Sequence, residues 1–257
     1  MCLVLFALGV SEDYPFIVLA NRDEFYNRPT LSAHLWPGLH GIAAGQDLLA
    51  GGTWLGLTRQ GAFATVTNYS EPSPDLPYPF SRGRLVLDYL ERSSTATVGA
   101  ELTPEQLDRY SGFNLVYGHI GKLWWQSNRS AQVRELPVGI TGLSNRLLDT
   151  PWHKVTLAKA LLHEILPKRF GTDDLFSVLA NTDRPLSGFP EKNGANTPTT
   201  ASSSPIFVNS NAYGTRSCTV ILITRKMQVT FIERIYAPNM QLVGDTRLEF
   251  VLDKTGS

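Results

Sequence analysis

The sequence predicts an α+β protein in which antiparallel sheets are covered by helices. Segments typical of strands occur in two groups, one before and one after a pair of helical segments in the middle of the chain. This order differs from the strict alternation of strands and helices in folds built from βαβ units. No linker separates two complete sets of strands and helices, so we expect residues 1–257 to form one domain.

The chain opens with two short apolar segments that predict a hairpin. Leu3 to Leu8 and Phe16 to Ala20 do not alternate with polar residues, so both strands are expected to be buried on both faces. The second strand is predicted to end at Asn21-Arg22-Asp23-Glu24. Polar groups at the end of a buried strand are costly unless they are paired or used. A turn capped by its own Asp and Asn side chains is the alternative.

A glycine-rich stretch, residues 41–61, follows a segment expected to be a loop, Thr30 to His40. It lacks the Gly-Lys-Ser/Thr ending of a phosphate-binding loop, and tight turns between strands explain its glycines better. Asp47 to Gly52 is predicted to be a hairpin loop. Strands are expected over Thr53 to Thr58 and Ala62 to Thr67, and the second of these leads into Asn68 and Tyr69.

The rest of the chain predicts helices, more strands and one long loop. Thr182 to Pro205 is rich in Pro, Ser, Thr, Gly and Asn, which is typical of a lid or a disordered loop. Asn145 closes a strand, and Arg216 stands at the entry of another. Helices are predicted from the cap Ser81 to Arg92, over Pro104 to Tyr110, over Trp152 to Leu166, and from the cap Thr172 to Asn181. Strands are predicted over Asn114 to Gly118, Leu123 to Ser127, Val133 to Leu136, Thr219 to Thr224 and Met227 to Tyr236.

Composition excludes several classes of function. Lys+Arg and Asp+Glu number 23 each, so charge gives no reason to expect binding to nucleic acid or to an anionic membrane. No apolar run approaches the roughly 18 residues of a membrane span, and we expect no signal peptide at the start. With two cysteines, Cys2 and Cys218, a disulfide framework is not expected, and a reducing, cytoplasmic location is.

Cys2 is the candidate nucleophile. If the initiator Met1 is removed, Cys2 carries a thiol and a free α-amine on one carbon, and the unperturbed proton affinities of these two groups are similar. The amine can then act as the general base for the thiol, as in N-terminal-nucleophile hydrolases. The alternative is a small hydrophobic residue of the core, which is the commoner role of a lone cysteine and the one we expect for Cys218.

A series of motifs runs through the chain: Met1-Cys2, Asn21-Arg22-Asp23-Glu24, Ala50 to Gly56, Thr67-Asn68-Tyr69, Leu143-Ser144-Asn145, Trp152-His153-Lys154 and Tyr213 to Ser217. Together they resemble the NRDE family, whose animal members are called transport and Golgi organisation protein 2. That family in turn resembles N-terminal-nucleophile (Ntn) hydrolases of the choloylglycine hydrolase and penicillin V acylase type, which implies a four-layer αββα sandwich of two stacked antiparallel sheets flanked by helices.

The resemblance implies roles for five catalytic residues. Cys2 matches the nucleophile, and Asp23 matches the aspartate that binds the α-amine. Asn68 and Asn145 resemble the asparagines that line the nucleophile and the oxyanion site. Arg216 resembles the arginine beside the thiol, where a positive charge favours thiolate.

Three further residues of these motifs, Arg22, Trp54 and Tyr69, are the candidate substrate-binding residues. Arg22 departs from the acylase pattern because it directly precedes Asp23, so the two side chains must point to opposite sides of an extended chain. A surface salt bridge, or a structural link to the region of Glu24, is therefore the role we expect for Arg22.

The motifs support two functions from different classes. The first is a cysteine amidohydrolase that cleaves the amide or thioester of an apolar acyl compound and needs no cofactor. The second is a carrier without enzymatic activity, because the NRDE family has been linked with secretory-pathway organisation, haem transfer and acyl-CoA or lipid metabolism. His34, His40 or Cys2 could then serve as a haem ligand, although the five histidines show no metal-ligand spacing. A third possibility is that the nucleophile set survives only as structure.

Overall fold

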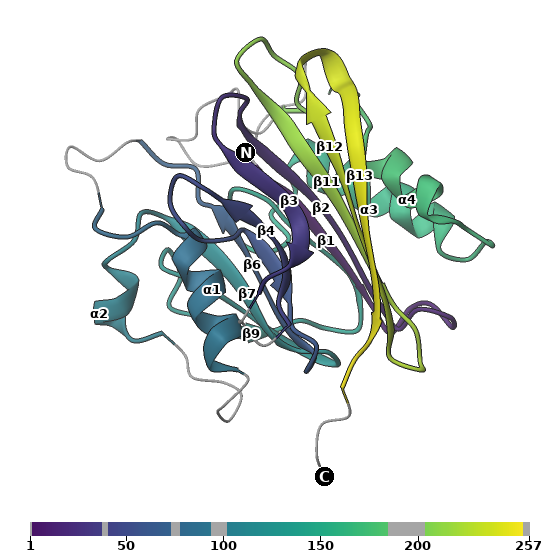
Figure 1. Cartoon of the computed structure of the whole chain (residues 1–257), viewed down its shortest axis with the longest axis horizontal. Coiled ribbons are helices and arrows are strands. Elements are labelled where there is room, and N and C mark those ends of the chain that lie inside the picture. Colours follow the sequence, from purple (N-terminus) through teal and green to yellow (C-terminus); the bar gives the residue numbers. More distant parts are fainter. Residues whose placement is uncertain (1, 38–40, 73–77, 94–101, 185–203, 254–257) are drawn as a thin grey trace.

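The protein is built from two stacked antiparallel sheets with helices on their outer sides (Figure 1). The computed structural model describes residues 2–37, 41–72, 78–93, 102–184 and 204–253. Within these ranges the order of layers is helix, sheet, sheet, helix. The four-layer αββα sandwich implied by the sequence motifs is confirmed.

The first sheet contains the chain's first two strands at its centre. Its strands, in their order across the sheet, are β10 (Gly139–Leu143), β1 (Leu3–Leu8), β2 (Phe16–Phe25), β11 (Tyr213–Ile223), β12 (Gln228–Ala237) and β13 (Gln241–Val251).

The second sheet is a meander in which every strand pairs with the next strand of the sequence. Its strands are β3 (Thr30–Leu35), β4 (Ala43–Asp47), β5 (Leu55–Leu57), β6 (Ala62–Asn68), β7 (Phe113–His119), β8 (Lys122–Ser127) and β9 (Arg134–Glu135). The helices are α1 (Gly83–Arg92), α2 (Pro104–Leu107), α3 (His153–Ile165), α4 (Thr172–Leu179) and the 3-10 turn η1 (Pro238–Met240).

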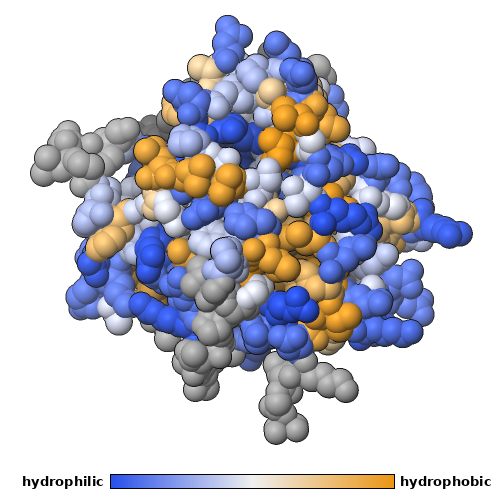
Figure 2. Space-filling view, viewed as in Figure 1, coloured by the Kyte–Doolittle hydropathy of each residue, from blue (hydrophilic) through white to orange (hydrophobic). Residues whose placement is uncertain are grey.

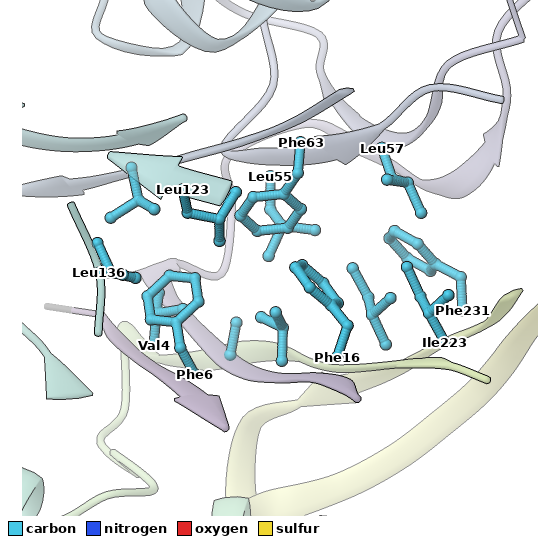
Figure 3. Packing of buried hydrophobic residues seen from close by; sticks show 14 of the residues in the cluster. Val4, Phe6, Phe16, Leu55, Leu57, Phe63, Leu123, Leu136, Ile223 and Phe231 are labelled. Carbon is cyan, nitrogen blue, oxygen red and sulfur yellow. The ribbon is translucent and has the colours of Figure 1, made fainter. Parts of the chain in front are cut away.

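Three clusters of buried hydrophobic side chains hold the layers together. The cluster between the sheets includes Phe6, Phe16 and Phe63, with the ring of Phe63 edge-on to both of the others (Figure 3). A second cluster packs α3 and α4 on the outer face of the first sheet, and a third packs α1 on the second sheet. Burial of this apolar area is the main stabilising contribution to such a fold.

Side chains of β1 and β2 alternate between the two faces of the first sheet. Val4 and Val18 belong to the cluster between the sheets, whereas Leu5 and Leu19 belong to the cluster under the helices. This is the period of two expected of an extended chain. Neighbouring residues on these strands therefore take part in different layers.

The prediction that the second strand ends at Ala20 is wrong. β2 continues to Phe25, and Asn21 pairs with Cys218 and Asp23 with Thr215 on β11. The partner strand, which is distant in sequence, supplies the backbone hydrogen bonds that a local turn would otherwise supply. The polar residues of the motif consequently lie inside a strand and their side chains point to alternate faces.

Most other predicted elements agree with the structure to within a few residues, but β4 was not predicted and β11 begins at Tyr213, six residues before its predicted start at Thr219. Thr30 to Leu35, predicted as loop, is strand β3 and pairs with β4. Strand β13 was not predicted, and it pairs along its length with β12. The predicted lid, Thr182 to Pro205, lies mostly outside the described residues.

The visible face in Figure 2 carries hydrophobic residues in several separate patches among hydrophilic ones. In the described ranges, none of the helices combines the length and the apolar composition that a membrane crossing requires.

Candidate functional site

Cys2 stands directly before β1, at one end of the first sheet, and is half-buried. Leu3 pairs with Asn21 on one side and Val4 pairs with Leu143 on the other. Cys2 therefore continues β1 between the polar half of β2 and the residues that follow β10.

Residues that follow β10 hold the backbone of Cys2 and connect it to the second sheet. The hydroxyl of Ser144 donates a hydrogen bond to the carbonyl oxygen of Cys2 at 2.8 Å, and it lies 3.2 Å from Oδ1 of Asn145. Asn145 Nδ2 in turn donates to the carbonyl oxygen of Asn68 at 2.8 Å. The hydroxyl of Thr67 donates to the Ser144 carbonyl at 2.7 Å. Cys2, Asn145 and Asn68 are thus joined where the two sheets meet.

The two asparagines differ in environment. Asn145 is buried, and its backbone carbonyl accepts a hydrogen bond from the amide of Ser70 at 2.8 Å. Asn68 is the last residue of β6 and is exposed. Asn145 is therefore a fixed donor in the structure, whereas Asn68 presents its side chain toward solvent.

Asp23 is buried within β2. Its Oδ1 accepts a hydrogen bond from the Thr215 hydroxyl at 2.6 Å, and its backbone carbonyl accepts one from the Tyr213 hydroxyl at 3.0 Å. Burial raises the pKa of Asp23, while the positive charges of the amino terminus and of Lys154, and the hydrogen bond from Thr215, act in the opposite direction. The carboxyl is thus placed among positive charges in a site shielded from water.

Arg22 is buried, so the surface salt bridge predicted for it is wrong. Arg22 is 6% exposed, and its guanidinium lies 4.2 Å from the centre of the Trp54 ring. It also lies within 3.4 Å of the Thr30 hydroxyl and 4.0 Å of a carboxylate oxygen of Asp47. These partners belong to the second sheet or adjoin it, because β2 stays extended and turns Arg22 toward the space between the sheets.

Arg22 interacts electrostatically with Cys2, the candidate nucleophile. Burial lowers the pKa of Arg22, and the negative charges of Cys2, Glu24 and Asp47 raise it. Among these, the interaction with Cys2 is the largest. An arginine on the inter-sheet side of β2 therefore interacts electrostatically with the thiolate form of Cys2.

Arg216 occupies the bulge where the pairing of β11 with β2 shifts register. Its guanidinium donates to the backbone carbonyls of Phe25 at 3.2 Å and Arg28 at 2.6 Å. It shares with Arg22 and Trp54 a cavity of about 30 Å³, which is also lined by Thr30, Ser32, Ser217, Glu233 and Ile235. The structure thus gathers three of the predicted residues around this cavity.

Tyr69 follows Asn68 and is held by Arg146. The guanidinium of Arg146 donates to the Tyr69 hydroxyl at 2.8 Å and lies 5.0 Å from the centre of its ring. The amide of Tyr69 donates to the carbonyl of Gly112. Tyr69 is therefore fixed beside the end of β6, near the Asn145 to Asn68 contact.

Residues 1–238 match the family described as Transport and Golgi organisation 2. The chain belongs to that family. The mouse Transport and Golgi organization 2 homolog is 33% identical over 256 residues, and the alignment covers 91% of this chain and 92% of the relative. The human homolog shows the same identity and coverage, and the Drosophila melanogaster protein is 28% identical over 264 residues, with 91% of each chain covered. The family resemblance expected from the motifs is confirmed.

Solved structures with a similar course of the chain are distant in sequence. A Caenorhabditis elegans ortholog of N-acylethanolamine-hydrolyzing acid amidase gives a TM-score of 0.48 at 13% identity, covering 86% of this chain and 92% of that chain. A mutant of the conjugated bile acid hydrolase from Clostridium perfringens gives a TM-score of 0.46 at 10% identity, covering 100% and 94%.

Two cations near Cys2 in this Transport and Golgi organisation 2 family member were not predicted. Arg82, just before α1, donates to the carbonyl of Gly112 at 3.2 Å and interacts electrostatically with Cys2. Lys154, in the first turn of α3, interacts with both Cys2 and Asp23. The helical period could have indicated Lys154, because it shares the buried face of its helix with Ala158 and Leu162. No local pattern singles out Arg82.

Glu233 is a third ionisable residue of this region that was not predicted, and it is buried. It is 1% exposed on β12, and a carboxylate oxygen accepts a hydrogen bond from the Ala33 amide at 2.6 Å. Burial raises its pKa to about 7, while the hydrogen bond from Ala33, the neighbouring hydroxyl of Ser217 and the charge of Arg22 act in the opposite direction. Glu233 thus lines the small cavity opposite Arg22.

Features away from Cys2 offer less chemistry. Cavities of about 620 Å³, lined by α3 and the start of β10, and about 520 Å³, at the turn between β11 and β12, do not include the candidate residues. His34 stacks on Trp36, and His40 lies outside the described residues. In the described part of the chain no three potential metal ligands cluster. Cys218 is fully buried, as predicted.

Proposed function

We propose that this protein is a cysteine amidohydrolase of the N-terminal-nucleophile type, acting on the amide or thioester of an apolar acyl compound. Removal of Met1 would expose the α-amine of Cys2. The observation that carries the proposal is the hydrogen-bonded connection from Cys2 through Ser144 and Asn145 to Asn68. It brings a thiol and amide donors to one end of the sheets, which is what acyl transfer requires.

In the proposed reaction, the neutral α-amine takes the thiol proton and Cys2 Sγ attacks the carbonyl carbon of the substrate. The oxyanion that forms would be stabilised by an amide donor such as Asn68, whose side chain is exposed to an arriving substrate. Collapse of this intermediate passes the proton to the leaving amine or thiol. Water then hydrolyses the acyl-enzyme and regenerates Cys2.

The charges around Cys2 support this chemistry. Arg22, Arg82 and Lys154 all interact favourably with a negative sulfur. Positive charges close to a cysteine favour its thiolate, which is the nucleophilic form. Asp23 would hold the α-amine, and its own negative charge is supported by Thr215 and Lys154.

The small cavity beside Arg22 sets a limit on where the substrate binds. A cavity of about 30 Å³ has room for roughly one water molecule. The acyl chain would therefore lie on the exposed side of Cys2, along Asn68 and Tyr69. Arg22 and Trp54 would then support the nucleophile from the inter-sheet side.

The test measures both the amino terminus and the activity. Intact-mass spectrometry of the mature protein should show the loss of Met1. Wild type should hydrolyse at least one member of a panel of N-acyl amides and acyl thioesters, and Cys2→Ala should lose at least about 99% of that activity, because a nucleophile is irreplaceable in covalent catalysis. Cys218→Ala is the matched control and should keep the activity.

Two results would overturn the proposal. A mature chain that retains Met1 has no α-amine on Cys2. Hydrolysis that survives Cys2→Ala has another origin. Saturable binding of haemin or an acyl-CoA without turnover, unchanged in Cys2→Ala, would instead support the carrier function.

A further inference from the structure

The ammonium group of Lys154 is buried without a hydrogen bond to the described residues, which is unusual for a charged side chain. Lys154 is 0% exposed, and its Nζ has no hydrogen-bond partner among the described residues. We propose that Lys154 is a positioning residue of the nucleophile. Its charge keeps Asp23 ionised and also disfavours protonation of the α-amine of Cys2, so that Asp23 can hold this amine while the amine stays neutral. This inference rests on the proposed function, since it concerns the same amine.

The packing of α3 places Lys154 at the correct end of the first sheet. Val155, the next residue, packs so closely on Gly142 of β10 that a Cβ on that glycine would lie 2.6 Å from Val155 Cγ1. Gly142 pairs with Leu5 of β1, only three residues from Cys2. The first turn of α3 therefore lies over the start of β1, and Lys154 faces the sheet there.

Burial makes the charge of Lys154 depend on Asp23. Transfer of an isolated ammonium or carboxylate from water to the protein interior is unfavourable. Burial accordingly lowers the pKa of Lys154 and raises that of Asp23, and each of the two charges acts against the shift of the other. Lys154 and Asp23 thus stabilise each other's charged form in a place that excludes water.

This pairing has a consequence for the general base. A carboxylate facing only the α-amine would favour the protonated ammonium form, which cannot accept the thiol proton. A second positive charge beside the same carboxylate disfavours that protonation through repulsion. Lys154 thereby allows Asp23 to orient the amine while the amine stays available as a base.

The groups that act on this arrangement come from several elements. Lys154 interacts electrostatically with Asp23 of β2 and with Cys2. Asp23 is in turn affected by the amino terminus and by the Thr215 hydroxyl of β11, and it influences Tyr26 and Cys218. Burial raises the pKa of Cys218 well above its usual range, so that thiol contributes little to alkylation near neutral pH.

The test is the pH dependence of Cys2 alkylation by iodoacetamide, followed by mass spectrometry of the amino-terminal peptide. In Lys154→Met the midpoint of the profile should move up by about one pH unit, and the rate at pH 7 should fall about tenfold, because a tenfold change corresponds to one unit. Lys154→Arg should restore much of the rate. Lys159→Met is the matched control, since Lys159 lies on the same helix, half-buried, in an ion pair with Asp149.

The outcomes separate this inference from the proposed function. A folded Lys154→Met protein with the wild-type midpoint and rate overturns the inference, even if wild type hydrolyses a substrate. The expected shift in alkylation supports it, even if no panel compound is hydrolysed and the proposed hydrolase function fails. Circular dichroism melting shows that the variant is folded, and Lys154→Gln provides a second neutral side chain if Lys154→Met does not fold.

Discussion

The hydroxyl of Ser144 donates a hydrogen bond to the backbone carbonyl of Cys2 at 2.8 Å. The backbone of the candidate nucleophile is thus held by a residue that follows β10, on the opposite side of β1 from Asp23. The same hydroxyl also lies 3.2 Å from Oδ1 of Asn145, so its single proton is directed mainly to Cys2 while Asn145 is held by its own bond to the Asn68 carbonyl.

Replacement of Ser144 by alanine should therefore affect reactivity more than stability. Ser144→Ala removes the donor to Cys2 and should reduce the free energy of unfolding by about 1 kcal/mol. The rate of Cys2 alkylation should fall several-fold because the amino terminus is less well held. Urea denaturation and alkylation kinetics measure the two effects. Ser177→Ala, which removes an exposed hydroxyl bonded to Asp174 on α4, should change neither.

Arg22 and Arg216 both line the small cavity, but they should affect the reactivity of Cys2 differently. Arg22 interacts with Cys2, whereas the hydrogen bonds of Arg216 go to the carbonyls of Phe25 and Arg28. Arg22→Met should lower the alkylation rate of Cys2 at pH 7 by about tenfold, since it removes a positive charge near the thiolate. Arg216→Met should lower it less and should instead loosen the end of β2.

The reverse order of these effects would return the role beside the thiol to Arg216, as the family resemblance implies. Hydrogen exchange at the amides of residues 25–28 provides the independent readout. Faster exchange in Arg216→Met alone would agree with a structural role at the end of β2.

The burial of Glu233 should make the free energy of unfolding depend on pH. Its pKa is about 7 in the folded protein, above the ordinary value of 4.5, because the carboxyl is buried. Between these two values the folded state keeps a proton that the unfolded state has lost. The free energy of unfolding contributed by this group is therefore fully present below pH 4.5 and is lost as the pH rises toward 7. The full loss is on the order of 3 kcal/mol.

Glu233→Gln should remove this dependence. Urea denaturation of wild type and variant at pH 5 and pH 8 isolates the effect, since the other titrating groups are common to both proteins. The variant should gain stability relative to wild type at pH 8. An equal change between the two pH values in both proteins would show that Glu233 does not retain its proton.

The sequence patterns predicted the parts of the fold that local periodicity determines. β1 was predicted with its observed ends because Leu3 to Leu8 is a continuous apolar run. The continuation of β2 past Ala20 was missed because it depends on pairing with β11, which lies about two hundred residues later. The burial of Arg22 follows from that same pairing and was missed with it.

For the candidate site, too, some residues could be predicted from the sequence and others could not. The motifs pointed to Cys2, Asn68 and Asn145, and hydrogen bonds connect these three in the structure. Lys154 belongs to the quoted motif Trp152-His153-Lys154 but received no role, because a lysine in an amphipathic helix usually faces water. The helical period could have indicated its buried position, but the charges of Asp23 and Cys2 that favour its ammonium form lie far away in the sequence.

Asn21 connects β2 to the layer of helices, and replacing it should therefore destabilise the protein. Its Nδ2 donates to the backbone carbonyls of Leu179, at the end of α4, and of Ile206, both at 2.9 Å. Asn21→Leu would leave both buried carbonyls without this donor and should lower the free energy of unfolding by about 3 kcal/mol. Asn27→Leu, at an exposed position two residues beyond β2, should change it by less than about 0.5 kcal/mol.

Denaturant unfolding of the two variants measures this difference, and hydrogen exchange at residues 176–179 shows where it acts. Asn21→Leu should accelerate exchange at the end of α4, because the Leu179 carbonyl loses its partner. Since Asn21 directly precedes Arg22 and Asp23, the same variant should also slow Cys2 alkylation. A large loss of stability with unchanged exchange in α4 would mean that Asn21 supports the strand alone and leaves α4 to be held by its apolar contacts.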